Sequence, residues 1–588
     1  ANAVGYFIDG VYVGGSPQAT ELANLERIEI LRGPQAAQFG RGTYAGAINY
    51  VTRKPSDEFE AIVDLQGGSD NIFIGTGSIS GPITDGLAYF LSAGYDTIDG
   101  QFTNNRDGSD IGGQETTSVT GKLLWEPSDM VDATLRIGYQ KTDDDHFAMY
   151  LQGREENNTA FRNANSPRSR EYYQGTAIID KGGVNLNTDI LQGAAGFSGV
   201  QYDRKIFSLT LNVNPNDDWL FSSITGYIED DIEQALDVSY GGYTFLPFSP
   251  AFAGLFNQWD KDEQTDFSQE LRGVFTGLEG WRFMFGGYYY KGTNDEIFSR
   301  GVGGPGPFQG IVTPLVGVDD TSETIENVAV FGSIDWDVLD NLTLTFEGRY
   351  AEDEITVVQR DPGTSEVTQS NNATFDNFTP RFTAVWSLND DLNLYGNIAK
   401  GTKPGTFNDS DECPELPEDV DEEQAWNYEI GLKGSVWDDR ATFAVAAYFL
   451  DVEDQQLTEV CENPNTGTTA SGISNVGKTE ITGIEFESTF ALTDFWTAGL
   501  TYAFTDSEIT QAINIDQADL LGSNGSLEQT RELGNIAGQK SPRVPEHQLS
   551  LFTRLEGQIN AENSWWIAAD YAFESSKYSQ VHNLIETG

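Results

Sequence analysis

The residues that most often perform catalysis or hold metals are scarce in this chain. Its three histidines, His146, His547 and His582, lie far apart and have no partners at metal-ligand spacing. No GxSxG, HExxH or P-loop motif is present. His146 directly follows Asp143–Asp145, which leaves two alternatives for it, a cation site or a solvated loop. We therefore predict neither an enzyme nor a resident metal or cofactor.

Residue types suited to binding are easier to find. Residues 239–259 are rich in aromatic side chains, and residues 301–317 consist largely of Gly, Pro, Val, Leu and Phe. Apolar segments that face water require a cover. They can pack on each other as a lid, hold an apolar or aromatic ligand, or dock a partner protein. The candidate ligand-binding residues here are Tyr240, Tyr243, Phe245 and Trp259.

The net charge limits the possible partners. The 588 residues carry a formal charge of −57 at pH 7, which excludes nucleic acid because its phosphates would be repelled. The charge suits solubility or a saline habitat, or alternatively a cation-attracting surface that divalent ions bridge to lipopolysaccharide. No run of 18 apolar residues occurs, so no transmembrane helix is predicted.

The elements that must position these residues are alternating strands. From about residue 59 the chain repeats a run of roughly ten alternating residues, a short polar turn, another run and a longer loop. Leu342, Leu344 and Phe346 alternate with polar residues that include Glu347. Successive strand residues face opposite sides. Charged residues such as Glu347 and Arg349 are tolerated only on the lumen side of a membrane barrel.

The lengths of the connections indicate the orientation of these strands. Short turns and long loops alternate, which is typical of a transmembrane barrel with periplasmic turns and extracellular loops. About 19 strands can be counted, and the last, near Trp565–Glu574, runs outward. Bacterial barrels close with an even number of strands, and plugged transporters have 22. We therefore predict that the chain is a fragment in which three strands are missing. The short turns are expected near 84–86, 215–218, 278–280, 339–341, 389–391, 438–440 and 493–495, and the long loops near 98–115, 143–203, 238–262, 296–325, 359–373, 402–423, 459–477 and 510–541.

The only two cysteines, Cys413 and Cys461, fall in predicted extracellular loops that flank a single pair of strands. An even count on an oxidising surface predicts a disulfide.

One segment resembles a known family closely. Residues 26–55 contain the runs ERIEILRGPQ, FGR, AGAIN and VTRKP. They resemble the second half of the plug domain of TonB-dependent outer-membrane receptors, whose pattern is ERIEVLRGPQ, YGR, GGAIN and a closing VT-basic-basic-Pro. Phe39 replaces the usual Tyr, and Ala45-Gly46 replaces Gly-Gly. Further segments similar to the family are Val4–Tyr12 in the plug and Phe378–Phe382, Asp391–Gly401, Trp426–Lys433, Asn475–Glu480 and Pro542–His547 in the barrel.

The resemblance implies an all-β architecture, a transmembrane antiparallel β-barrel with an N-terminal plug domain inside its lumen. Residues 1–56 correspond to the C-terminal half of the plug, and residues 57–588 to the barrel, of which about 19 of 22 strands are present. The first half of the plug and the segment that contacts TonB would then precede this chain.

The resemblance also implies which plug residues are functional. Arg32 is expected to pair with glutamates of the barrel wall, here Glu270 and Glu429, and so to lock the plug in place. The alternative is that Arg32 only solvates the plug surface. Gln38, Arg41 and Tyr44 near the plug apex would complete a ligand site from below.

The function that the resemblance implies is energy-coupled import of a scarce ligand across the outer membrane of a Gram-negative bacterium, with a TonB-type energy-coupling protein of the inner membrane as partner. Ferric siderophores rank first as ligand, and oligosaccharide, cobalamin or another metal chelate stay open. The scarcity of histidine argues against haem. The rival hypotheses are a passive channel, disfavoured by the plug, and a surface scaffold that docks a partner protein on the apolar loops.

Overall fold

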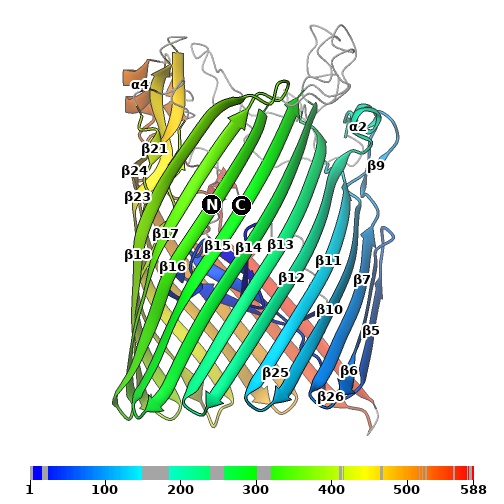
Figure 1. Cartoon of the computed structure of the whole chain (residues 1–588), viewed down its shortest axis with the longest axis vertical. Helices are drawn as coiled ribbons and strands as arrows, with labels where there is room; N and C mark the ends of the chain where they lie inside the picture. The colour runs from blue at the N-terminus through cyan, green and yellow to red at the C-terminus, as the bar shows by residue number, and fades with distance from the viewer. Residues whose placement is uncertain are drawn as a thin grey trace.

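The architecture is a β-barrel that encloses a small sheet (Figure 1). It is seen in a computed structural model, which describes residues 4–15, 24–148, 184–238, 257–300, 319–408, 414, 416–463, 468–514, 517–518, 521–523, 526–560, 563–578, 581 and 586–587. None of the helices among these residues is long and apolar enough to cross a membrane.

The described part of the barrel wall contains 19 strands, the number counted in the sequence. They are β5 (Glu60–Gly67), β6 (Phe73–Thr84), β7 (Leu87–Ile98), β10 (Gln114–Ser128), β11 (Val131–Asp145), β12 (Gly199–Asn216), β13 (Trp219–Asp237), β14 (Asn257–Leu278), β15 (Trp281–Arg300), β16 (Asp319–Leu339), β17 (Leu342–Arg360), β18 (Val367–Asn389), β19 (Leu392–Lys403), β22 (Glu423–Val436), β23 (Ala441–Asn463), β24 (Thr468–Thr493), β25 (Trp496–Gln511), β26 (His547–Gln558) and β27 (Ser564–Glu574).

Consecutive strands of the wall pair antiparallel, and the strand order places β27 beside β5, which closes the wall. Residue-by-residue pairing joins β27 to β26 and β5 to β6, and both faces of β27 are exposed.

The two faces of the wall have opposite character, as the alternation predicts. On β17, the apolar or aromatic side chains of Phe346 and Tyr350 are 49% and 47% exposed, whereas Arg349 and Asp353 are each 2% exposed. Apolar residues face outward and charged residues inward, the reverse of a soluble protein and the arrangement that a lipid-facing barrel requires.

The connections differ at the two ends of the barrel. All of the predicted short turns lie at one end, at the bottom of Figure 1. Toward the opposite end in Figure 1 lie α2 (Thr188–Ala195), α4 (Leu527–Leu533), β9 (Asp110–Ile111) and β21 (Asp419–Val420). Short strands also pair outside the wall: β8 (Phe102–Thr103) with β9, β20 (Thr406–Phe407) with β21, and β28 (Lys577–Tyr578) with β29 (Glu586–Thr587). The predicted loop at 459–477 is shorter than expected, because β23 and β24 stay paired as far as Asn463 and Thr468.

The enclosed sheet contains four strands in the order β2-β1-β4-β3. They are β1 (Val4–Ile8), β2 (Val11–Val13), β3 (Leu25–Arg32) and β4 (Gly46–Thr52), and the one-turn helix α1 (Ala36–Phe39) lies between the last two. Strands β1 and β4 run parallel, and the other pairs are antiparallel. In Figure 1 this dark-blue sheet lies inside the barrel, about halfway along its length. We call residues 4–52 the plug.

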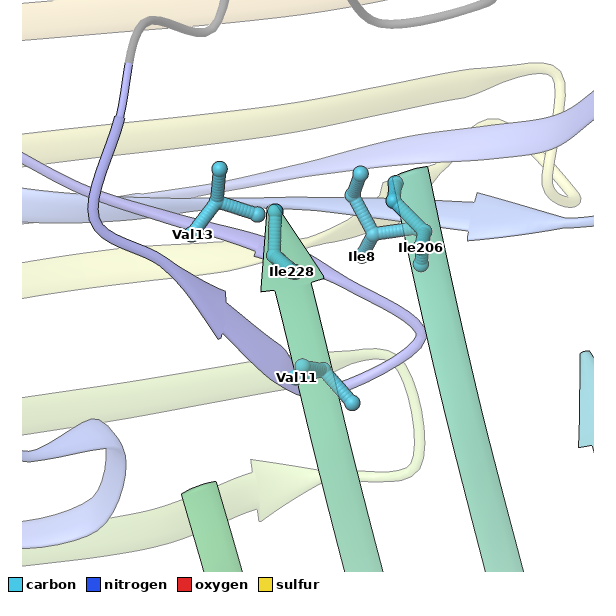
Figure 2. Packing of buried hydrophobic residues seen from close by; sticks show 5 residues of the cluster. All are labelled: Ile8, Val11, Val13, Ile206 and Ile228. Carbon is cyan, nitrogen blue, oxygen red and sulfur yellow. The ribbon is translucent and has the colours of Figure 1, made fainter. Parts of the chain in front are cut away.

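Apolar contacts hold one edge of the plug against the wall. Figure 2 shows Ile8, Val11 and Val13 of the plug beside Ile206 of β12 and Ile228 of β13, and all five side chains are at most 8% exposed. The alternation of the wall strands leaves these two isoleucines facing inward, and Ile224 of β13 packs against the same cluster. The cluster therefore fixes the position of the plug at this part of the wall.

Candidate functional site

The segment after α1 is a tight turn pressed against the wall. Gly40 has φ +81°, and a Cβ at this position would lie 2.6 Å from Cζ of Arg349 on β17. A glycine meets both requirements, since it adopts positive φ without strain and leaves room for the guanidinium. The turn thereby brings the next residue, Arg41, into the lumen.

Arg41 forms the most deeply buried ion pair between plug and wall. Its Nη1 lies 2.5 Å from Oδ1 of Asp353, and the two side chains are 6% and 3% exposed. The guanidinium also lies over the ring of Tyr290, 5.8 Å from its centroid. Burial disfavours the charge of Arg41, but Asp353 together with Tyr12, Tyr290 and Glu323 outweighs this and raises the pKa of the guanidinium. Arg41 thus stays charged and fixed beside the open part of the lumen.

Arg32 pairs with two carboxylates of β24 instead of the predicted Glu270 and Glu429. Its Nη1 contacts Glu485, and its Nη2 lies 2.6 Å from Oε1 of Glu487. Burial disfavours the charge of Arg32, yet Glu485 and Glu487 raise its pKa. The side chain remains 55% exposed, so this contact is much more accessible to water than the pair that Arg41 forms.

The two predicted partners of Arg32 have other neighbours. Glu270 lies 2.6 Å from Nη2 of Arg272. Glu429 accepts a hydrogen bond from the hydroxyl of Tyr395 at 2.7 Å, and it lines the same cavity of about 700 Å³ as Arg32. Glu429 therefore shares a cavity with Arg32 but is not its ion-pair partner.

A further contact, around Asp9, has no counterpart in the sequence-based expectations. Asp9 accepts hydrogen bonds from the backbone N–H and the hydroxyl of Thr52, at 2.8 and 2.5 Å. It also lies 3.2 Å from Nζ of Lys122 on β10 and 3.9 Å from Nη1 of Arg136 on β11. Burial raises the pKa of the Asp9 carboxyl, but the two cations and the hydrogen bonds lower it overall. The sequence did not indicate this role, because an Asp followed by Gly is common in turns and points to no partner.

The predicted ligand residues of the plug face different surroundings. Gln38 accepts a hydrogen bond from Nη2 of Arg381 at 3.2 Å and lines the cavity beside Arg32. Tyr44 is 7% exposed and packs with Ala425 and Val452. Of the three, only Arg41 reaches the outer cavity described next.

The outer cavity is the candidate ligand site, and we call it the vestibule. It measures about 420 Å³ and lies between the plug and wall strands β14 to β17, with residues after β19 and parts of β23 and β24 completing it. The plug contributes Tyr12, Gly14 and Arg41. The wall contributes polar groups that include Gln264, Asp266, Tyr290, Asn294, Glu323 and Lys403. A mixed polar lining of this size can orient part of a small ligand.

The predicted loop residues fall mostly outside the described part of the chain. Tyr240, Tyr243, Phe245 and Cys413 lie outside the described residues. The backbone of Cys461 belongs to β23, but its side chain is not among those described, so the disulfide stays a prediction. Trp259 packs near Leu191 of α2, and its Nε1–H donates to Oε1 of Glu233 at 2.6 Å. It therefore joins α2 to the wall.

His146 forms neither of the two sites considered for it. It is 1% exposed. Its Nδ1 lies 2.8 Å from the carbonyl oxygen of Phe147, and its Nε2 accepts the backbone N–H of Asp237 at 2.8 Å. Both nitrogens are thus occupied. Burial lowers the pKa of the ring. No group of three or more potential metal ligands occurs among the described residues.

Comparison with known proteins places this geometry in context. Residues 138–584 match the model of the TonB-dependent receptor-like β-barrel, and residues 1–47 match that of the TonB-dependent receptor plug domain. The chain is 23% identical to the pesticin receptor of Yersinia enterocolitica over 512 residues, which cover 86% of this chain and 67% of the relative. It is 24% identical to the metal-pseudopaline receptor CntO of Pseudomonas aeruginosa over 524 residues, with the same coverage.

Solved structures share the fold at low sequence identity. The ferric yersiniabactin uptake receptor FyuA from Yersinia pestis superposes with a TM-score of 0.72 at 18% identity, covering 100% of this chain and 79% of that one. The siderophore receptor PiuA from Acinetobacter baumannii gives 0.71 at 15% identity, with 99% and 80% coverage. The sheet inside a barrel is therefore a recurrent arrangement and not peculiar to this chain.

Proposed function

Because the chain belongs to the TonB-dependent receptor family, we propose that it imports a scarce ligand across the outer membrane, with a ferric siderophore ranked before other metal chelates. The members of this family are receptors and transporters of the Gram-negative outer membrane. The named relatives include receptors for metal-pseudopaline and for ferripyoverdine, which supports a metal chelate as ligand. Oligosaccharide and cobalamin are the alternatives.

The observation that carries the proposal is a vestibule whose floor is the plug. Tyr12, Gly14 and Arg41 of the plug line the same cavity as the wall residues. A ligand bound there touches both parts, so a displacement of the plug changes its binding site directly. Differential contact of this kind is what couples a ligand to a conformational change.

The plug contacts also disfavour a passive channel. Ion pairs join the plug to β10, β17 and β24 through Lys122, Asp353 and the pair Glu485 and Glu487. Moving the plug breaks several of these contacts together. We infer that an external source of energy is needed, supplied by a TonB-type energy-coupling protein of the inner membrane.

Uptake of ⁵⁵Fe chelates by cells that produce the protein tests the proposal. We expect saturable uptake that stops when the proton-motive force is collapsed or TonB is deleted. A non-saturating flux that survives both treatments would indicate a passive channel instead. Protein abundance under iron starvation and iron repletion gives an independent check, since unchanged abundance would favour a ligand other than an iron chelate.

A second function as a docking surface has one specific support. A structure similar to this chain is titled as a complex of FpvAI with pyocin S2 (TM-score 0.70, 16% identity). A surface protein on the extracellular loops, and lipopolysaccharide around the wall, are the corresponding proposed partners here. Purification of the protein from its native membrane with a stoichiometric protein partner would support docking.

A further inference from the structure

The cations of the vestibule are already neutralised by carboxylates of the wall. Arg41 is paired with Asp353, as described above. Nζ of Lys403 lies 3.8 Å from Oε2 of Glu423, whose side chain is 7% exposed. Arg41 and Lys403 are the only cationic residues among the described residues that line this cavity. Neither offers an unopposed positive charge to a ligand.

Two further carboxylates of the vestibule, Asp266 and Glu323, form no ion pair among the described residues, and the charges of Arg204 and Arg41 act on them only from a longer distance. Asp266 is 3% exposed. It accepts from the hydroxyl of Tyr290 at 2.6 Å and from the backbone N–H of Gly14 at 3.0 Å. Nε2 of Gln264 lies 3.2 Å from its Oδ2. All of these groups are neutral donors. They favour the ionised form of the carboxylate, whereas its burial disfavours the charge.

Glu323 on β16 is the second of these carboxylates. It is half-buried and lines the cavity, and no ion pair involves it in the described part of the chain. Asp266 and Glu323 line the vestibule together with Arg41 and Lys403. Asp353 and Glu423 lie behind the two cations as their ion-pair partners, so four carboxylates accompany two cations. Negative charge is therefore in excess where a ligand would bind.

We propose that the vestibule selects the part of a ligand that is neutral or cationic and rich in hydrogen-bond donors, and that it rejects polyanionic chelates. The proposal rests on the proposed import function, because it concerns the same cavity. Like charges brought together across an interface are a strong source of discrimination. Ferric hydroxamates that are neutral or carry a free ammonium fit this requirement, whereas ferric tris-catecholates and ferric citrate do not.

Thiol modification measures the charge of the cavity without any ligand. Thr406 lines the vestibule, so the variant Thr406→Cys can be treated with a cationic and an anionic methanethiosulfonate of similar size. The control is Ser365→Cys, an exposed position between the acidic Asp361 and Glu366. It reports the general effect of an acidic surface, and the unsubstituted chain reports the reactivity of Cys413 and Cys461.

We expect the ratio of cationic to anionic modification rates at position 406 to exceed that at position 365 by about tenfold, since a cleft with an excess of one sign of charge concentrates counter-ions, at the lower end of the range for clefts of a single sign. Adding Glu323→Gln should reduce the ratio severalfold, and adding Asp266→Asn should reduce it further. Glu323→Gln alone keeps the test informative if Asp266→Asn fails to fold. Equal ratios at the two positions would overturn the proposal.

Binding of defined ferric chelates then separates this inference from the import function. The probes are ferrioxamine B, which carries an ammonium, its neutral N-acetyl derivative, a ferric tris-catecholate and ferric citrate. Preferential binding of the first two, with Glu323→Gln improving binding of the anionic pair, supports the proposal. Tight binding of an anionic chelate would overturn the charge selectivity while leaving import intact. If none of the chelates binds, the iron-chelate function fails and the thiol ratio still decides the charge of the vestibule.

Discussion

The substitution Arg41→Gln tests which contact holds the plug. Arg41 and Asp353 are 6% and 3% exposed, so removing the guanidinium leaves a carboxylate buried without a counter-ion. Breaking a buried pair in this way costs about 3–5 kcal/mol. Since each 1.4 kcal/mol is roughly a factor of ten in an equilibrium constant, the fraction of molecules with an undocked plug should rise by roughly two to four powers of ten.

Hydrogen exchange of the plug in lipid nanodiscs measures this equilibrium. Peptides that cover β1 and β4 report it, because the hydrogen bonds of these strands lie within the plug and exchange when the plug, no longer held by the wall, unfolds. The matched control is Arg32→Gln. The Arg32 side chain is 55% exposed, and an exposed pair contributes under about 1 kcal/mol, so its effect on exchange should be within roughly a factor of five.

The double variant Arg41→Gln/Asp353→Asn tests the assignment to this pair. It removes both charges, so neither partner is left charged and unpaired. The loss of docking free energy in the double variant should therefore be smaller than the sum of the losses in the two single variants. If Arg41→Gln and Arg32→Gln accelerate exchange equally, or if the two single effects add without coupling, the reasoning from burial is refuted.

Three further changes have defined outcomes. Gly40→Ala should weaken plug docking by about 1–3 kcal/mol in the same exchange assay, because Gly40 has φ +81° and its Cβ would lie 2.6 Å from Arg349; unchanged exchange would contradict the close packing. Ile228→Ala should reduce the free energy of plug docking by about 2–5 kcal/mol, since Ile228 is 2% exposed and packs against the plug. Hydrogen exchange in β1 should therefore become faster, and an effect confined to the wall would contradict the packing in Figure 2. Burial lowers the pKa of His146, so its neutral ring contributes stability that is present above the unfolded pKa of about 6.5 and is lost as pH falls below it. Proteolysis around residues 184–196 should therefore increase from pH 7.5 to pH 5, and His146→Gln, which keeps an acceptor for the Asp237 N–H, should abolish that pH dependence; an identical pH profile in the variant would refute this account.

The wall was predictable from the sequence because its signal is local. Alternation on β17 separates Phe346 from Glu347 without knowledge of any other strand, and two-residue turns such as the one between Leu339 and Leu342 require no distant partner. The loop predicted at 459–477 is too long, because its polar residues indicate the end of the strands. In the structure β23 and β24 continue their backbone pairing through these polar residues.

The partners of the plug were not predictable to the residue. The sequence indicated Arg32 as a plug cation, but 453 residues separate it from Glu485. Glutamates of both β22 and β24 line the cavity beside Arg32, and the rotation of the plug inside the wall decides which one Arg32 meets. That rotation depends on non-local packing, including the apolar cluster around Ile228 and the contacts of Asp9. Local patterns contain no information about it.

The plug contacts are unevenly distributed around the wall. The pairs formed by Asp9 and Arg41 are largely buried, whereas Arg32 is half-exposed and is flanked by cavities of about 460 and 700 Å³. A pull along the barrel axis therefore acts on a body that is fixed on one side and weakly held on the other, and the result is a torque. The plug would tilt about its buried contacts, and a crescent-shaped passage would open first along β24 and β25, with the rest of the plug still inside the barrel.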